Sequence, residues 1–217
     1  MSGIPDAVSL TRELIAFNTV NPPGAEEAPV RHLGGLLETA GFAVRYLELA
    51  EGRSSLVARL DGGGRPNICL AGHIDVVPLG AAEWQRDPFA GEIDGDRLYG
   101  RGASDMKSGV AVMVAAAAAA AGSVGKGAGI TVAVTADEEI GCGGSRHMAE
   151  TAGALGEAGA LLVAEPTANY PLVGHRGALW LELSTEGVTA HGSMPDEGVN
   201  AIYPTARAVG KLERFDF

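Results

Sequence analysis

Acidic and histidine side chains recur where predicted strands end. They are His73 and Asp75, Asp105, the pair Glu138 and Glu139, and Glu165. In open α/β sheets, ligands bind outside the carboxyl ends of the strands, so residues far apart in sequence can meet in one cleft. Imidazole and carboxylate groups bind divalent cations and also transfer protons. The pattern therefore predicts a single polar cleft at one edge of a sheet.

His73 and Asp75 lie two residues apart on a predicted strand, so their side chains point to the same side. Asp75 can then accept a hydrogen bond from the imidazole nitrogen that a metal does not use, which would orient the ring. A buried His–Asp pair with a purely structural role is the alternative. For an isolated His-x-Asp, that alternative stays open.

The acidic run Asp137-Glu138-Glu139 follows an apolar predicted strand. Adjacent carboxylates repel one another unless a cation or solvent compensates their charge. A solvated loop would explain such a run. The apolar and glycine-rich segment 140–144 that follows disfavours full solvation.

The remaining candidates for chemistry are weaker. No Gly-x-Ser-x-Gly elbow is present in the sequence, which disfavours a serine nucleophile. Cys69 and Cys142 lie in apolar or glycine-rich surroundings, so we expect buried free thiols in a reducing compartment. His32 and His147 fall in predicted helices, where packing or solvent exposure explains them better.

Hydrophobic periodicity predicts the elements that position these residues. Helices are expected at 6–17, about 25–39, 107–121 and from 143 or 144 to 152, and strands at 42–49, 55–60, 67–77, 130–135 and 160–163. The loop 79–105 should contain a short hairpin near Asp94-Gly95. From Leu172 onward we expect an alternating strand at 178–184 and a helix from about Asn200. This is an α/β pattern with a first domain over 1–172 and the start of a second over 173–217.

Composition and charge exclude several classes of function. The 217 residues are 46% hydrophobic and 20% charged with a net charge of −11, which does not suit a nucleic-acid partner. The N-terminus lacks the basic region and apolar core of a signal peptide. The longest apolar run, 110–121, is too short to span a bilayer. We therefore expect a cytoplasmic protein with no nucleic-acid or membrane partner.

The sequence contains six motifs whose order and spacing cover nearly the whole chain. They are Gly72-His73-Ile74-Asp75-Val76-Val77-Pro78, Gly100-Arg101-Gly102-Ala103-Ser104-Asp105-Met106-Lys107-Ser108-Gly109, Asp137-Glu138-Glu139-Ile140-Gly141, Glu165-Pro166-Thr167, Gly174-His175-Arg176-Gly177 and Ala190-His191-Gly192-Ser193. Together they resemble the M20 family of metallopeptidases and deacylases, which includes acetylornithine deacetylase, succinyl-diaminopimelate desuccinylase, aminoacylase and a glutamate-releasing carboxypeptidase. The resemblance implies a zinc-peptidase-like, three-layer catalytic domain with a mixed sheet, followed by the beginning of an α+β lid or dimerisation domain.

The resemblance also implies a site for two divalent metal ions. Asp105 would bridge the ions, with His73 and Glu165 on one of them and Glu139 on the other. The donor set suits Zn²⁺, and Mn²⁺ or Co²⁺ would accept the same ligands. In such sites the ions lie about 3.5–4 Å apart and polarise the scissile carbonyl.

The resemblance also implies three further roles. Glu138 would be the general base and Asp75 would steer His73. His191 resembles the lid histidine that, in dimeric members, reaches the neighbouring subunit's site to stabilise the oxyanion. Taken by itself, a histidine in a polar loop is more often surface decoration. From the resemblance, we expect the full-length protein to form a homodimer through the lid.

The expected reaction is hydrolysis of an amide bond in an N-acyl amino acid or small peptide. Glu165 favours deacylases and carboxypeptidases, because some aminopeptidase-like relatives have aspartate there. Full-length family members continue further and supply one more histidine ligand, so we expect a chain truncated at its C-terminus. The alternative is a catalytically incompetent fragment that binds metal or mediates oligomerisation.

Overall fold

The computed structural model describes residues 5–125 and 127–216 and divides the chain into two compact units. The first unit extends to Tyr170, and the second begins at Pro171. Within the described residues, no helix has the length and apolar character needed to cross a membrane.

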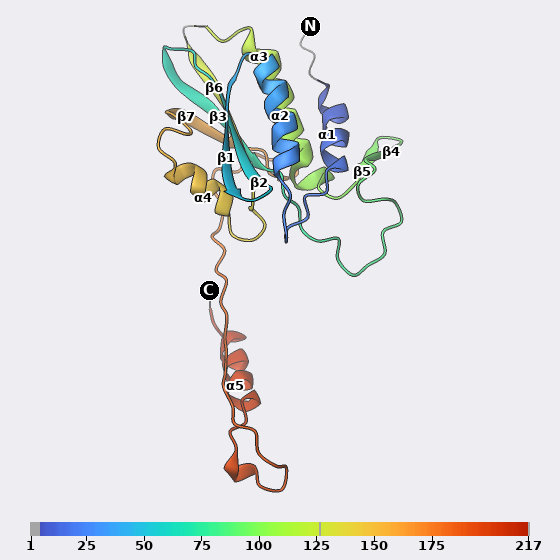
Figure 1. Ribbon diagram of the computed structural model, residues 1–217, viewed down its shortest axis with the longest axis vertical. Helices are drawn as coiled ribbons and strands as arrows, with labels where there is room; N and C mark the ends of the chain where they lie inside the picture. Colours follow the sequence, from blue (N-terminus) through green and yellow to red (C-terminus); the bar gives the residue numbers. More distant parts are fainter. Residues whose placement is uncertain (1–4, 126, 217) are drawn as a thin grey trace. The chain divides into compact units, whose positions relative to one another are not determined.

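A five-stranded mixed sheet forms the centre of the first unit (Figure 1). Its strands are β1 (Ala43–Ala50), β2 (Arg53–Leu60), β3 (Arg65–His73), β6 (Ala128–Thr135) and β7 (Ala158–Val163). They lie in the order β1-β2-β6-β3-β7 across the sheet. The pairs β1–β2 and β2–β6 are antiparallel, whereas β3 runs parallel to both β6 and β7. The carboxyl ends of β3, β6 and β7 therefore meet at one edge.

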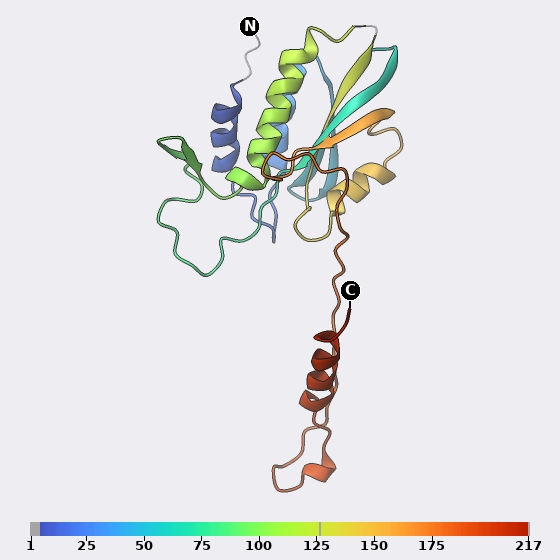
Figure 2. The same ribbon diagram turned by 180° about the vertical axis from the view of Figure 1, so that it is seen from behind.

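Helices cover both faces of the sheet, which confirms the expected three-layer α/β fold (Figures 1 and 2). They are α1 (Ala7–Ala16), α2 (Glu27–Thr39), α3 (Ser108–Ala121) and α4 (Gly143–Glu150). Helices α1, α2 and α3 share one core with Val132 and Val134 of β6. On the opposite face, Met148 of α4 packs with Ala133 of the same strand. This alternation is expected for a strand buried on both faces.

The helices begin and end for local reasons. Asp6 caps α1, because its carboxylate accepts hydrogen bonds from the backbone N–H groups of Val8 and Ser9. Helix α2 is followed by Gly41, whose φ of +94° is a conformation that glycine adopts without strain. These two predicted helices are confirmed to within two residues.

Strand β3 ends earlier than the sequence predicts. The chain leaves the sheet after His73 and pairs instead with the segment that follows α1. There Val76 N–H donates to the Thr19 carbonyl, and Asn21 N–H donates to the Val76 carbonyl. This separate pairing turns Asp75 away from the regular ladder while keeping it fully buried.

The loop after β3 contains the predicted hairpin, formed by β4 (Glu92–Asp94) and β5 (Arg97–Tyr99). Gly95 at its tip has a φ of +61°, as a tight turn requires. An irregular turn at Ala103–Lys107 then leads into α3 and carries Asp105.

The second unit contains a 3₁₀ helix (Pro195–Glu197), the helix α5 (Ile202–Leu212) and an isolated bridge between Val188 and Val199. Helix α5 confirms the predicted helix near residue 200. The strand predicted at 178–184 is wrong for the described structure, where these residues are exposed and assigned no strand. A strand needs a hydrogen-bonding neighbour, and none of the described segments pairs with 178–184.

Candidate metal centre

The residues singled out in the first unit meet at the carboxyl ends of three parallel neighbours. His73 is the last residue of β3, and Glu165 lies two residues beyond β7. Glu138 and Glu139 follow β6, while Asp105 comes from the turn before α3. Adjacent parallel strands place their carboxyl ends side by side, so the sheet topology itself gathers these groups.

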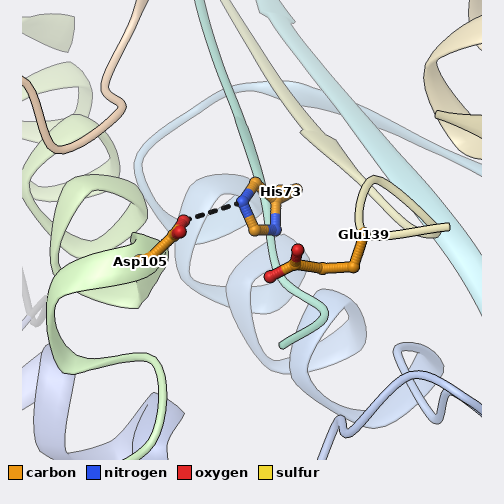
Figure 3. A group of neighbouring side chains, drawn as sticks. All are labelled: His73, Asp105 and Glu139. Carbon is orange, nitrogen blue, oxygen red and sulfur yellow. Dashed lines mark hydrogen bonds and ion pairs between the residues drawn. The ribbon is translucent and has the colours of Figure 1, made fainter. Parts of the chain in front are cut away.

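The imidazole of His73 lies at the centre of this cluster. Its Nε2 atom is 3.2 Å from Asp105 Oδ1, 3.6 Å from Glu165 Oε1 and 3.9 Å from Glu138 Oε2. Figure 3 shows His73, Asp105 and Glu139 pointing toward one another from three separate elements. One potential ligand atom from each of these three residues lies within 4.8 Å of the other two.

The other side of the His73 ring is held by Asp75. His73 Nδ1 is 3.0 Å from the Asp75 carbonyl oxygen and 3.5 Å from Asp75 Oδ1. Burial of the ring lowers the pKa of His73, but the carboxylates of Asp75, Glu165 and Glu138 outweigh this effect and raise the pKa to about 9. The ring is thus oriented from behind, with Nε2 facing the acidic cluster.

Asp75 organises the surrounding backbone as well as the imidazole. Its Oδ1 accepts a hydrogen bond from Glu138 N–H at 3.1 Å, and its Oδ2 accepts one from Glu139 N–H at 3.2 Å. Asn21 Nδ2 donates a further hydrogen bond to Oδ2 at 2.8 Å. Burial alone would raise the pKa of Asp75, but these donors and His73 lower it below its ordinary value. The carboxylate is therefore held ionised in a fully buried position.

The acidic run after β6 separates into two environments. Asp137 is compensated by protein groups, because Arg53 donates to its Oδ1 at 2.9 Å and Asn21 donates to the same oxygen at 3.0 Å. Glu138 instead lies beside the His73 ring, and the Glu139 carboxylate belongs to the group that can hold a metal. The two explanations considered for the run, compensation by solvent or by a cation, therefore do not apply to all three acids together.

The donor set of the cluster fits a divalent cation. Burial and nearby carboxylates, Asp105 among them, raise the pKa of Glu139 and of Glu165 above the ordinary value. Such shifts mean that the positive groups of the protein do not fully compensate the negative charge of these ionised carboxylates. Imidazole nitrogen and carboxylate oxygens are also the donors that Zn²⁺, Mn²⁺ and Co²⁺ accept.

Sequence reasoning missed the residues behind the cluster. Asn21 stands in an Asn-Pro-Pro-Gly turn that predicted only the end of a helix, and Arg53 begins an ordinary strand. Glu26 is fully buried and paired with Arg53. Their partners lie 27 to 116 residues away, so no local spacing pattern identifies them.

Two sequence predictions concern groups outside this cluster. His191 lies in the second unit, where its Nδ1 accepts a hydrogen bond from Ser193 N–H at 3.2 Å.

Cys69 is a buried free thiol as predicted. Cys142 is also free but is exposed, because it occupies the tight turn before α4, so the prediction of a buried thiol is wrong there.

A family model and curated relatives match the chain. A family model described as Peptidase family M20/M25/M40 matches residues 69–201. The chain is 39% identical over 223 residues to a succinyl-diaminopimelate desuccinylase of Phenylobacterium zucineum, covering 98% of this chain and 57% of the relative. For the enzyme of the same name from Rhodospirillum centenum, identity is 40% over 221 residues, covering 96% and 56%. The chain thus spans just over half the length of these curated relatives.

Solved structures with little sequence identity share the fold. An aminopeptidase of Bacillus cereus matches with a TM-score of 0.60 and 19% identity, over 94% of this chain and 56% of the other. A tripeptidase of Staphylococcus aureus matches with a TM-score of 0.59 and 18% identity, over 94% and 55%.

Proposed function

This chain belongs to peptidase family M20/M25/M40, and from that premise we propose that the protein hydrolyses the amide bond of an N-acyl amino acid or small peptide with two divalent metal ions. The observation that carries the proposal is the convergence of ligand atoms from His73, Asp105 and Glu139 within 4.8 Å. These residues are separated by more than 30 positions in sequence, yet the sheet topology brings them together.

We assign His73 and Glu165 to one metal ion, Glu139 to the other, and Asp105 as the bridge between them. The positions of Asp105 and Glu165, at 3.2 and 3.6 Å from His73 Nε2, support this division. Zn²⁺ is the proposed ion, with Co²⁺ and Mn²⁺ as alternatives that suit the same donors. When bound, the ions polarise the scissile carbonyl and make water more acidic.

Glu138 is the proposed general base. Its carboxylate is 40% exposed, so it can reach solvent, and it lies 3.9 Å from His73 Nε2, so it also faces the cluster. Its backbone N–H is fixed by Asp75. Glu138 would take a proton from the attacking water and deliver it to the leaving amine.

Asp75 and His191 complete the proposed set. Asp75 orients His73, as the contacts at 3.0 and 3.5 Å support. A backbone N–H can only donate, so the bond from Ser193 leaves His191 Nδ1 as an acceptor. In a neutral imidazole the proton then resides on Nε2, which is free to donate to a developing oxyanion.

The two desuccinylase relatives suggest the substrate class. We propose an N-acyl amino acid with a free carboxylate, and N-succinyl-diaminopimelate is the first compound to test. The family resemblance also leads us to propose a cytoplasmic homodimer that associates through residues 173–217.

The test uses the 217-residue chain loaded with excess Zn²⁺, followed by dialysis and elemental analysis. Amine release from N-succinyl-diaminopimelate and from N-acetylornithine is then measured. Glu138→Gln should lower kcat by about 10²- to 10⁴-fold while zinc content stays at the wild-type level. Glu150→Gln, at an exposed position at the end of α4, is the matched control and should leave both quantities unchanged.

A different result would decide against the proposal. If the wild-type chain binds two zinc ions and hydrolyses neither compound at any zinc concentration, the hydrolase function is wrong for this chain. A metal-binding or oligomerisation role would then be the better description.

A further inference from the structure

A buried ionic network lies behind the loop that carries Glu138 and Glu139. Arg53, the first residue of β2, donates to both carboxylate oxygens of Glu26, from Nε at 3.0 Å and from Nη2 at 2.6 Å. Its Nη2 also donates to Asp137 Oδ1 at 2.9 Å. One guanidinium therefore links a fully buried carboxylate to Asp137, the first residue of the acidic run.

Asp137 is held through its main chain as well. Its N–H donates to Glu26 Oε1 at 3.3 Å, while Asn21 Nδ2 donates to Asp137 Oδ1 at 3.0 Å and to Asp75 Oδ2 at 2.8 Å. The network thus fixes Asp137 and also contacts Asp75, the carboxylate that binds the next two backbone N–H groups.

The backbone of Asp137 requires such support. Its φ of +60° is in the left-handed region, which side-chain-bearing residues seldom adopt. A residue stays in this region only when its surroundings hold it there. Gly143 contributes by leaving room for the Asp137 carboxylate, since a Cβ at Gly143 would collide with Asp137 Oδ2.

We propose that Arg53 is a positioning residue for the hydrolytic reaction, which anchors Asp137 and thereby aims Glu138 and Glu139 at the metal centre. The inference rests on the proposed function for its catalytic consequence. Its structural part concerns the loop alone and can be tested without turnover.

The geometry separates this role from simple neutralisation of Glu26. A guanidinium has five N–H donors in a planar fork and can bind two carboxylates at once, whereas a lysine ammonium is a point charge on a flexible stem. Arg53→Lys therefore keeps a positive charge for Glu26 but loses the fixed bridge to Asp137. An arginine that only neutralised the charge of Glu26 would tolerate this change, whereas a positioning arginine would not.

Two variants and one control make up the experiment. Arg53→Lys is the first variant. The double variant Glu26→Gln/Arg53→Gln is the second, because it removes both members of the Glu26–Arg53 ion pair and leaves only the partly exposed Asp137 carboxylate without its cation, which protects against a failure to fold. Arg59→Lys is the control, since Arg59 lies on the same strand and pairs with Asp61 at the surface.

Hydrogen exchange of the metal-free protein is the first measurement. In both variants, exchange of the amides in 136–142 should accelerate by about tenfold or more, while exchange in β6 stays at the wild-type rate. Arg59→Lys should match the wild type throughout. Affinity for the zinc ion assigned to Glu139 should fall by about 10- to 100-fold, because Glu139 is displaced.

Kinetics with zinc and N-succinyl-diaminopimelate are the second measurement. Misplacement of the Glu138 carboxylate should lower kcat by about 10- to 100-fold, with KM within about twofold of the wild-type value. Wild-type exchange in 136–142 and wild-type zinc affinity in both variants would overturn the inference. A wild-type chain without turnover would refute only the proposed function, since exchange and zinc affinity would still report on Arg53.

Discussion

Replacing Asp75 by asparagine should destabilise the metal-free protein by about 3–5 kcal/mol, the cost of removing one partner from a buried charged network. The reason lies in the donors around the carboxylate. Oδ1 accepts Glu138 N–H and faces His73 Nδ1, while Oδ2 accepts Asn21 Nδ2 and Glu139 N–H. Whichever way the new amide is turned, its NH₂ group faces two donors.

The magnitude follows from those lost contacts. A hydrogen bond to a charged group contributes about 1.5–3 kcal/mol, and a buried donor left without an acceptor costs about 1–3 kcal/mol. Asp75 is fully buried, so water cannot replace the missing acceptor. At least one strong bond is lost and at least one donor is left unsatisfied, which gives the range above.

Urea unfolding of the metal-free protein at about pH 7, with an unchanged m value, measures the effect. The control is Asp94→Asn, because Asp94 is exposed and pairs with Arg86 at the surface. That change should cost less than about 1 kcal/mol. If Asp75→Asn lowers the free energy of unfolding as little as Asp94→Asn does, the Asp75 carboxylate does not organise the site.

Four further substitutions test the charges and the packing of the first unit. The His73 pKa of about 9 means that its protonated form stabilises the fold fully below pH 6.5 and that this contribution is lost as pH rises through about 9. The stability advantage of metal-free wild type over His73→Gln, measured by urea unfolding, should shrink over that interval. Burial lowers the pKa of Lys107 from 10.5 to about 7 in the folded protein. Between these two pH values the unfolded chain therefore binds more protons than the folded chain. Wild type should therefore gain stability relative to Lys107→Met as pH rises through that window, which paired thermal melts would detect. Gly143→Ala should lower stability by about 1–3 kcal/mol, because its Cβ meets the Asp137 carboxylate. Gly35→Ala, at an exposed helical position with open space around the Cβ, should instead raise it by about 0.4–1 kcal/mol in the same melts.

The parts of the fold predicted from sequence are those with a local cause. Periodic apolar residues identified α1, α2 and the central strands, alanine-rich composition identified α3, and Asp94-Gly95 identified the hairpin. The gathering of His73 and Glu165 was also predictable, because residues at the carboxyl ends of parallel strands share one edge.

The parts that sequence could not supply depend on distant partners. Nothing near Arg53 shows that it binds Glu26 and Asp137, which lie 27 and 84 positions away. Asn21 carries no signal beyond its turn, yet it contacts two aspartates of the site. The alternating pattern at 178–184 failed for a related reason, since alternation predicts a strand only where a neighbour completes the ladder.

The contrast between satisfied and unsatisfied carboxylates explains how this acidic site can exist before any cation binds. Asp75 and Asp137 receive hydrogen bonds from backbone N–H groups, Asn21 or Arg53, so protein groups stabilise their charge. For Glu139 and Glu165, burial and neighbouring carboxylates outweigh the compensating charge of His73, and the pKa of each is raised. The two satisfied aspartates therefore stabilise the fold, while the two glutamates remain the proposed ligands for a divalent cation. Replacing a satisfied aspartate should lower stability first, whereas replacing either of these glutamates should lower metal affinity and leave the metal-free fold intact.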